Sequence, residues 1–510
     1  MSASRYLRLG LAALLAIGIV VGGTPGTILG HAIGGTYTLP VPLWLYLAAA
    51  ALAVAASFVV TALLARTPSD APPRYPTRPI DTGVAGIIRT ALRILGLAWW
   101  YGAIVVGVVV GDISPMPAVL FWIGIWVAVP IAAVLAGNPW PSLSPFRTTY
   151  SGIEWLLGRI GMKRLDAGLP YPAGLARWPA VALLGLGLWA ELVLPNGEVA
   201  GTVAWLVLAY TVMTLAGMAL FGQVAWLRHA ELFEVEFGWF GRIGPLGRRS
   251  IHAQLCEGCG EECDPTRCVD CPECAVAADD SERRPELRPW IAGLTEVTRA
   301  GWSDAAFIVL ALAGVSFDGL QETAFGGALL SWLLPPVQAL FGLTGTTFLV
   351  LDTLALVVVA LAFGAAFTLI VLASHALADP GRRLPLSRTA GVYAATLLPI
   401  AGGYLLAHYL TLVIQGAVWL PSLIVDPLMS LAPALDWIPT GLVWYLSVAA
   451  IVGGHVAGVV LAHRLALRDA PSRAVVAGLP MVGLMIAYTV LSLWIIAQPI
   501  VVEPAVTPAA

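Results

Sequence analysis

The sequence consists largely of long apolar segments that are separated by shorter polar ones. Of its 510 residues, 59% are hydrophobic and only 11% are charged, whereas a soluble domain carries about 25% charged residues. A soluble helical protein is excluded, because so few charges cannot cover the surface that a chain of this size would expose. The sequence therefore predicts an all-α, polytopic transmembrane helix bundle of about eleven spans. The predicted spans are 9–24, 43–65, 94–111, 117–136, 178–195, 201–222, 303–320, 347–374, 390–417, 442–463 and 475–498.

The basic residues are confined to alternate loops between these spans. All 27 Lys and Arg residues can be placed before the first span or in every second loop after it, and the other loops contain none. Cytoplasmic loops carry the excess of Lys and Arg, so the N-terminus is predicted to be cytoplasmic and the C-terminus external. The first span also resembles a signal peptide, whose cleavage would leave about ten spans.

All six Cys residues lie in one predicted cytoplasmic loop, within the stretch CEGCGEECDPTRCVDCPEC. The cytoplasm is reducing, so a disulfide framework is not expected. The two outer C-x-x-C pairs have the spacing of a tetrahedral zinc site. The last three Cys residues with one upstream Cys resemble an iron–sulfur ligand set instead. The sequence predicts a bound zinc ion or iron–sulfur cluster, with a metal-free, redox-labile loop as the alternative. The candidate ligands are Cys256, Cys259, Cys263, Cys268, Cys271 and Cys274.

Several ionisable residues lie inside the spans near their predicted outer ends. An ionisable side chain is costly to place there, so each one is a functional candidate. No Lys or Arg lies at this level to neutralise them, which suits a proton or cation site, or a metal bound by His and carboxylate ligands. These residues are Glu191, Asp318, Glu322, Asp352 and His408.

A second group of ionisable residues lies near the predicted inner level and comprises His375, His455, His463 and Asp304. His455 and His463 share roughly one helical face, because their spacing is a little over two turns. His375 and His463 lie at one depth, as the two axial ligands of a haem b would. The alternative for each His is an interfacial side chain that is hydrogen-bonded to a backbone carbonyl.

Glycine and proline residues interrupt several apolar stretches. Residues 325–345 and 418–441 are apolar but broken by Pro and Gly, which predicts re-entrant or interfacial hairpins. Gly453 and Gly454, directly before His455, would let a neighbouring helix or a flat cofactor approach closely.

The chain divides into three predicted parts. Residues 1–222 form a six-span membrane half, 223–300 a cytoplasmic Cys-rich loop that binds metal, and 301–510 a five-span membrane half. The lipid bilayer is the predicted partner, and a redox role would add partner subunits. The net charge of −3 gives no reason to expect a nucleic-acid partner.

Several stretches resemble a family of bacterial polytopic membrane proteins. They are HAIGGTYTLPVPLWLYL (31–47), GNPWPSLSPFR (137–147), VSFDGL (315–320), HYLTLVIQG (408–416) and GGHVAGVVLAHRLAL (453–467). The resemblance implies a multi-pass protein of the bacterial cytoplasmic (inner) membrane. Some members are named fenitrothion hydrolase, which implies an organophosphate-degrading activity. The resemblance carries over no catalytic residues, so they remain unknown.

Three functions are compatible with these features. The Cys cluster and the inner histidines favour a redox or quinone-linked membrane subunit. The number of spans, the outer acidic level and the broken segments favour a transporter for a cation or a proton-coupled solute. The resemblance and the set of His and Asp residues favour a membrane-embedded, metal-dependent hydrolase. The sequence contains no H-E-x-x-H, P-loop or G-x-S-x-G motif, so a self-contained ATP-driven pump is excluded and enzymatic activity is left open.

Overall fold

The computed structural model describes residues 37–65, 78–80, 82–161, 165–250, 268–269, 283–295, 297, 300–381, 384–429, 433–435 and 437–502. Within that part of the chain, ten helices are long and apolar enough to cross a membrane. The prediction of an all-α polytopic bundle is confirmed. The predicted span 9–24 lies outside the described residues.

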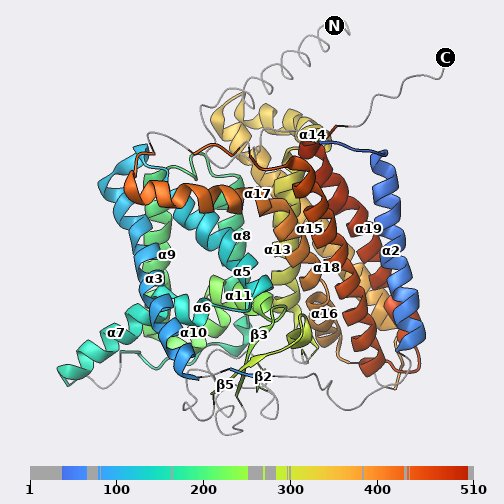
Figure 1. Ribbon diagram of the computed structural model, residues 1–510, viewed down its shortest axis with the longest axis horizontal. Helices are drawn as coiled ribbons and strands as arrows, with labels where there is room; N and C mark the ends of the chain where they lie inside the picture. The colour runs from blue at the N-terminus through green and yellow to red at the C-terminus, as the bar shows by residue number, and fades with distance from the viewer. Residues whose placement is uncertain are drawn as a thin grey trace, which may run out of the picture.

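Most predicted spans correspond to single helices. They are α2 (Leu43–Leu64), α3 (Thr82–Val109), α8 (Trp178–Leu192), α9 (Ala200–Phe221), α13 (Trp302–Gln321), α15 (Gly345–Leu377), α18 (Thr440–Asp469) and α19 (Ala474–Ile500). With its 15 residues, α8 is shorter than the roughly 20 residues that a full crossing needs. These helices run side by side and form the walls of the bundle (Figure 1).

Two predicted spans are internally irregular. Span 117–136 is built from α4 (Met116–Ala118), the π-helix η2 (Val119–Ala128) and α5 (Val129–Leu135). Span 390–417 is divided into α16 (Leu386–Ala395) and α17 (Leu398–Val425). The division falls just before Pro399, which supplies no backbone N–H and favours the first turn of a new helix.

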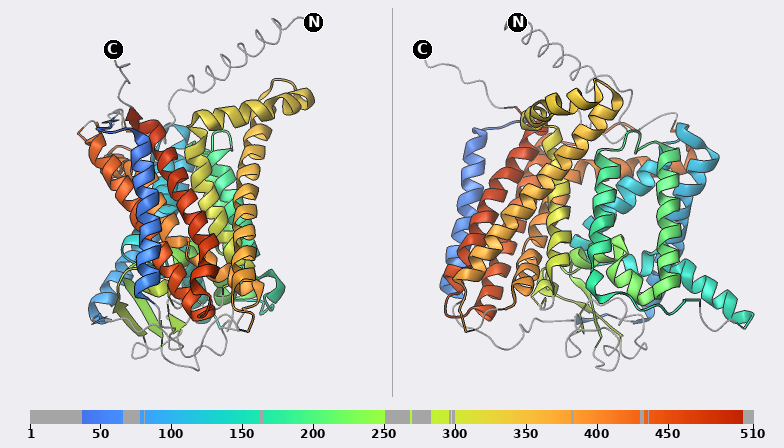
Figure 2. Two further views of the ribbon diagram at one scale, coloured as in Figure 1. Left: turned by 90° about the vertical axis from the view of Figure 1, so that its right-hand side faces the viewer. Right: turned by 180° about the vertical axis from the view of Figure 1, so that it is seen from behind.

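The segment predicted as a hairpin at 325–345 is instead one helix, α14 (Ala324–Phe341), which contains Pro335 and Pro336. Figure 2 shows α14 lying across one end of the bundle rather than along it. A single helix satisfies nearly all of its backbone hydrogen bonds internally, which a hairpin at this depth would not.

Short strands lie at both ends of the bundle. Strands β2 (Arg78–Pro79), β5 (Arg283–Leu287), β3 (Leu246–Ser250) and β4 (Cys268–Val269) form an antiparallel sheet in the order β2-β5-β3-β4. We call this the sheet end, and it also holds α7 (Pro145–Arg159) and α10 (Gln223–His229) (Figure 1). At the opposite end, β1 (Tyr37–Thr38) pairs in parallel with β6 (Val501–Val502). The sheet end is the one predicted to be cytoplasmic.

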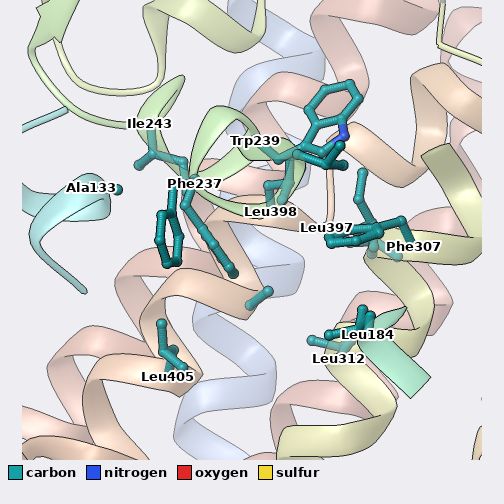
Figure 3. Close-up of a cluster of buried hydrophobic side chains, with 14 of the residues drawn as sticks. Ala133, Leu184, Phe237, Trp239, Ile243, Phe307, Leu312, Leu397, Leu398 and Leu405 are labelled. Atoms are coloured by element: carbon teal, nitrogen blue, oxygen red, sulfur yellow. The ribbon is translucent and has the colours of Figure 1, made fainter. Parts of the chain in front are cut away.

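The beginning of the predicted loop 223–300 is packed inside the bundle. Helix α11 (Leu232–Gly241) is buried along almost its whole length and contacts α5, α8 and α6 (Trp140–Leu143). Its side chains Phe237 and Trp239 share a hydrophobic cluster with Leu184 of α8 and Phe307 of α13 (Figure 3). This helix therefore belongs structurally to the membrane bundle.

Glycine residues bring α17 and α18 into close contact. A Cβ atom on Gly454 would lie 2.4 Å from the carbonyl oxygen of Pro399, and one on Gly403 would lie 2.3 Å from that of Ala450. A Cβ atom on Gly453 would meet nothing within 4 Å. The close approach of α17 therefore explains the glycine at position 454. This was one of the two reasons predicted for the glycine pair, the other being a flat cofactor.

Candidate intramembrane site

Two side chains of α17 contact the carboxylate of Asp318 in α13. The hydroxyl of Tyr409 donates a hydrogen bond of 2.8 Å to its Oδ2, and Nε2 of His408 lies 2.9 Å from the same oxygen. The side chains of Asp318 and His408 are only 14% and 7% exposed. Gly319 makes room for this contact, since a Cβ atom there would lie 3.3 Å from Cε1 of His408. The structure thus brings together two residues that the sequence placed at one level.

A small cavity adjoins this group. Its volume is about 30 Å³, and its lining includes Trp126, Glu191, Glu236 and Tyr409 among apolar side chains of α8, α11, α13 and α17. The indole Nε1 of Trp126 donates a hydrogen bond of 2.6 Å to Oε2 of Glu191. Because Tyr409 lines the cavity and also binds Asp318, it connects the two.

Glu236 is a member of the site that the sequence did not indicate. It is 8% exposed, and its Oε2 has no hydrogen-bond partner among the described residues. Burial raises the pKa of Glu236 to about 8, and the charge of Glu231 acts in the same direction. Its neighbours in the sequence are apolar, as in VEFGWF, and that was the only local signal that this glutamate could be buried.

Glu231 holds the N-terminus of α11. Its carboxylate accepts hydrogen bonds from the backbone N–H groups of Phe233 and Glu234, at 3.1 and 2.6 Å. It also accepts from the hydroxyl of Tyr210 at 2.5 Å and from Nε1 of Trp140 at 3.2 Å. This is N-cap geometry, which satisfies N–H groups that a helix start leaves without partners. Burial raises the pKa of Glu231 to about 7.

A buried ion pair fixes α11 to α7. Nε of Arg147 lies 3.2 Å from Oε2 of Glu234, and Nη2 lies 3.1 Å from Oε1. Arg147 and Trp140 both belong to the stretch GNPWPSLSPFR, so one use of that stretch is to hold the helix that carries Glu236.

Two further residues predicted for the outer level are Glu322 and Asp352. Glu322 is exposed just beyond the end of α13. Asp352 is half-buried in α15 and forms no hydrogen bond or ion pair within the described part of the chain. Asp318 and His408 of the predicted outer set therefore contact each other, and Glu191 lines the cavity that Tyr409 also lines.

His375 and His463 are directed to different neighbours. Nδ1 of His375 lies 3.3 Å from Oγ1 of Thr389 in α16, whereas Nε2 of His463 lies 3.2 Å from the carbonyl oxygen of Ala65, after α2. For His463 this is the predicted alternative of a bond to a backbone carbonyl. Haem b stays a prediction that no contact among the described residues supports.

The remaining inner residues also form separate contacts. Nδ1 of His455 lies 2.8 Å from the carbonyl oxygen of Ile451, one turn earlier in α18, and the side chain is buried. Asp304 forms an ion pair with Arg177, which precedes α8. The structure therefore does not show Asp304 joined to the histidines.

The Cys residues are largely outside the described part of the chain. Cys256, Cys259, Cys263, Cys271 and Cys274 lie outside it, and Cys268 is described only as backbone in β4, opposite Ser250. Among the described residues, no group of three or more His, Cys, Asp or Glu side chains is arranged to hold a metal ion. The zinc or iron–sulfur site stays a prediction.

Comparison with known proteins gives no further guide to this site. No family model matches the chain, and no curated protein or solved structure matches it. The function is therefore inferred from the geometry of the site.

Proposed function

We propose that this integral membrane protein is a secondary transporter that couples its substrate to a proton or small cation. The observation that carries the proposal is Asp318, a largely buried carboxylate between two apolar helices that binds both His408 and Tyr409. Ionisable residues inside a bundle are costly to bury and mark ion or proton pathways. A change in protonation at Asp318 or His408 would strengthen or break their contact, and so alter how α13 packs against α17.

The interrupted helices support the same proposal. Transporters commonly bind substrate and ions where helices are discontinuous, because freed backbone groups and helix ends face a protein-lined cavity there. Here α11 is a buried helix of 10 residues, too short to cross a bilayer. It contributes to the same cavity as α17, which follows the break after α16.

The two other functions depend on different parts of the chain. A redox or quinone-linked subunit depends on the inner histidines and on the Cys cluster, of which only the backbone of Cys268 is among the described residues. A metal-dependent hydrolase depends on the family resemblance and on the His and Asp residues, and among the described residues no three or more His, Cys, Asp or Glu side chains are arranged to hold a metal ion. The contacts of Asp318 with His408 and Tyr409 suit proton or cation coupling, so the transporter is the function that the geometry of this site supports best.

The proposal is tested in liposomes that contain the purified full-length chain and a trapped pH-sensitive dye. Gradients of Na⁺, K⁺ or Mg²⁺, or an electrical potential, are imposed in turn. We expect at least one of them to move protons faster than in protein-free liposomes. D318N removes the charge and the titratable group, which weakens hydrogen bonds worth about 1.5–3 kcal/mol each, so it should slow this movement by about tenfold or more.

The matched control is E198Q. Glu198 lies between α8 and α9 and lines no part of the cavity, so this variant should transport at the wild-type rate. Proton movement that equals protein-free liposomes under every gradient would overturn the proposal. Equal rates for wild type and D318N would overturn the role of Asp318.

A further inference from the structure

Two carboxyl groups line the cavity beside Tyr409, and one of their oxygen atoms accepts no hydrogen bond from the described residues. Glu236 enters from α11 with an Oε2 that has no hydrogen-bond partner in the described part of the chain. Glu191 enters from α8 with one oxygen held by Trp126. A buried carboxyl group that lacks a partner costs free energy, so a ligand that completes its hydrogen bonds would be favoured at this point.

The size and lining of the cavity identify the ligand. A water molecule needs roughly 10–15 Å³ and two to four polar partners, and this cavity offers about 30 Å³. Among the described residues, Glu191, Glu236 and Tyr409 are the only lining side chains that contain oxygen. Mg²⁺ and Ca²⁺ require about six or more oxygen ligands, which these three side chains do not supply. The cavity therefore suits water and a proton better than a divalent cation.

We propose that Glu191 and Glu236 form a proton-exchange pair bridged by water, and that Tyr409 links this pair to Asp318. In one transfer, the O–H bond of protonated Glu236 breaks as the water accepts the proton. The water releases another proton to the carboxylate of Glu191, where a new O–H bond forms. One proton changes place, the water is regenerated and no electrons are transferred.

The charges around Glu236 favour one shared proton. Glu231 lies on the same helix, and Glu191 faces Glu236 from α8. On the α17 side, Tyr409 donates a hydrogen bond to Asp318. Arg147 forms an ion pair with Glu234. Two carboxyl groups that share a poorly solvated site cannot both ionise easily. This pair would supply protons to the site of the proposed function, and in that respect the inference rests on it.

The exchange pair is tested by infrared spectroscopy of the full-length protein in detergent, titrated from about pH 5 to pH 9. We expect a band of protonated carboxyl groups that decreases as the pH rises. Glu231 also contributes to this band, so E236Q should remove only the part that belongs to Glu236. E191Q should shift the midpoint of that part, because the two groups interact. E198Q should leave the part of the band that E236Q removes unchanged. Thermal unfolding of each variant shows that it is folded, and both substitutions preserve side-chain size.

The possible results separate this inference from the transport proposal. If liposomes show no proton movement but the band behaves as expected, the transport proposal fails and the exchange pair stands. A band that E191Q leaves unchanged would overturn the pair, because Glu236 would then titrate alone. Loss of the band on addition of Na⁺ at constant pH would also overturn it, because the cavity would then bind a metal cation. Absence of any titrating band in wild type would have the same consequence.

Discussion

Replacement of Arg147 by Met tests how α11 is held in the bundle. The side chains of Arg147 and Glu234 are 8% and 2% exposed and meet through two contacts of 3.1 and 3.2 Å. R147M leaves the Glu234 carboxylate buried without its cation, which costs about 3–5 kcal/mol. Replacing both residues with apolar ones of similar volume is often neutral or stabilising, because neither charge is then desolvated. The double variant R147M/E234M should therefore recover most of the loss.

The matched control is R159M, on the same helix. Arg159 lies 4.4 Å over the ring of Trp155 at the surface, an interaction worth about 0.5–1 kcal/mol. Thermal unfolding in detergent is followed by circular dichroism at one fixed scan rate, because unfolding of such proteins is often irreversible. R147M should unfold several degrees below wild type, with R159M and the double variant close to wild type. Our account of the ion pair is refuted if R147M unfolds at the temperature of R159M, or if R147M/E234M unfolds as early as R147M.

Three further predictions follow from other parts of the chain. G454A should lose about 1–3 kcal/mol of stability because its methyl group would meet the carbonyl oxygen of Pro399 at 2.4 Å. G453A should gain up to about 1 kcal/mol, and similar midpoints for the two would argue against close packing of α17 on α18. Burial raises the pKa of Glu236 from 4.5 to about 8, so the folded protein retains a proton there that the unfolded chain loses. Stability should then decrease as the pH rises from about 5 to 8, and a pH profile of E236Q as steep as that of wild type would disprove this contribution. Elemental analysis of protein purified without chelator should find zinc or iron, and substitution of the outer Cys pairs by Ser should remove it. Protein that contains neither metal would eliminate the metal-binding loop (Cys256, Cys259, Cys271 and Cys274).

The pattern of apolar and basic residues was sufficient to predict the bundle. Long apolar segments can satisfy their backbone hydrogen bonds in a membrane only as helices, so length and composition decide the fold class. Local sequence signals, such as proline residues and charges, were less reliable where the chain does not form one uninterrupted apolar helix. The Pro pair at 335–336 indicated a break, yet α14 continues through it. Residues 223–300 were predicted to form a cytoplasmic loop, yet α11 is buried in the bundle because Glu231 and Glu234 have partners from α6, α7 and α9.

Depth along the membrane normal was determined by sequence position, since each helical residue advances by about 1.5 Å. That was enough to place Asp318 and His408 at one level. Which way each helix faces was decided only by tertiary packing, because contacts such as those of Gly403 and Gly454 set the rotation of α17. Packing alone turned Tyr409 toward Asp318 and brought Glu236 to the same cavity as Glu191. The sequence by itself therefore determined the spans and the level of the acidic site, and the tertiary structure decided which residues form it.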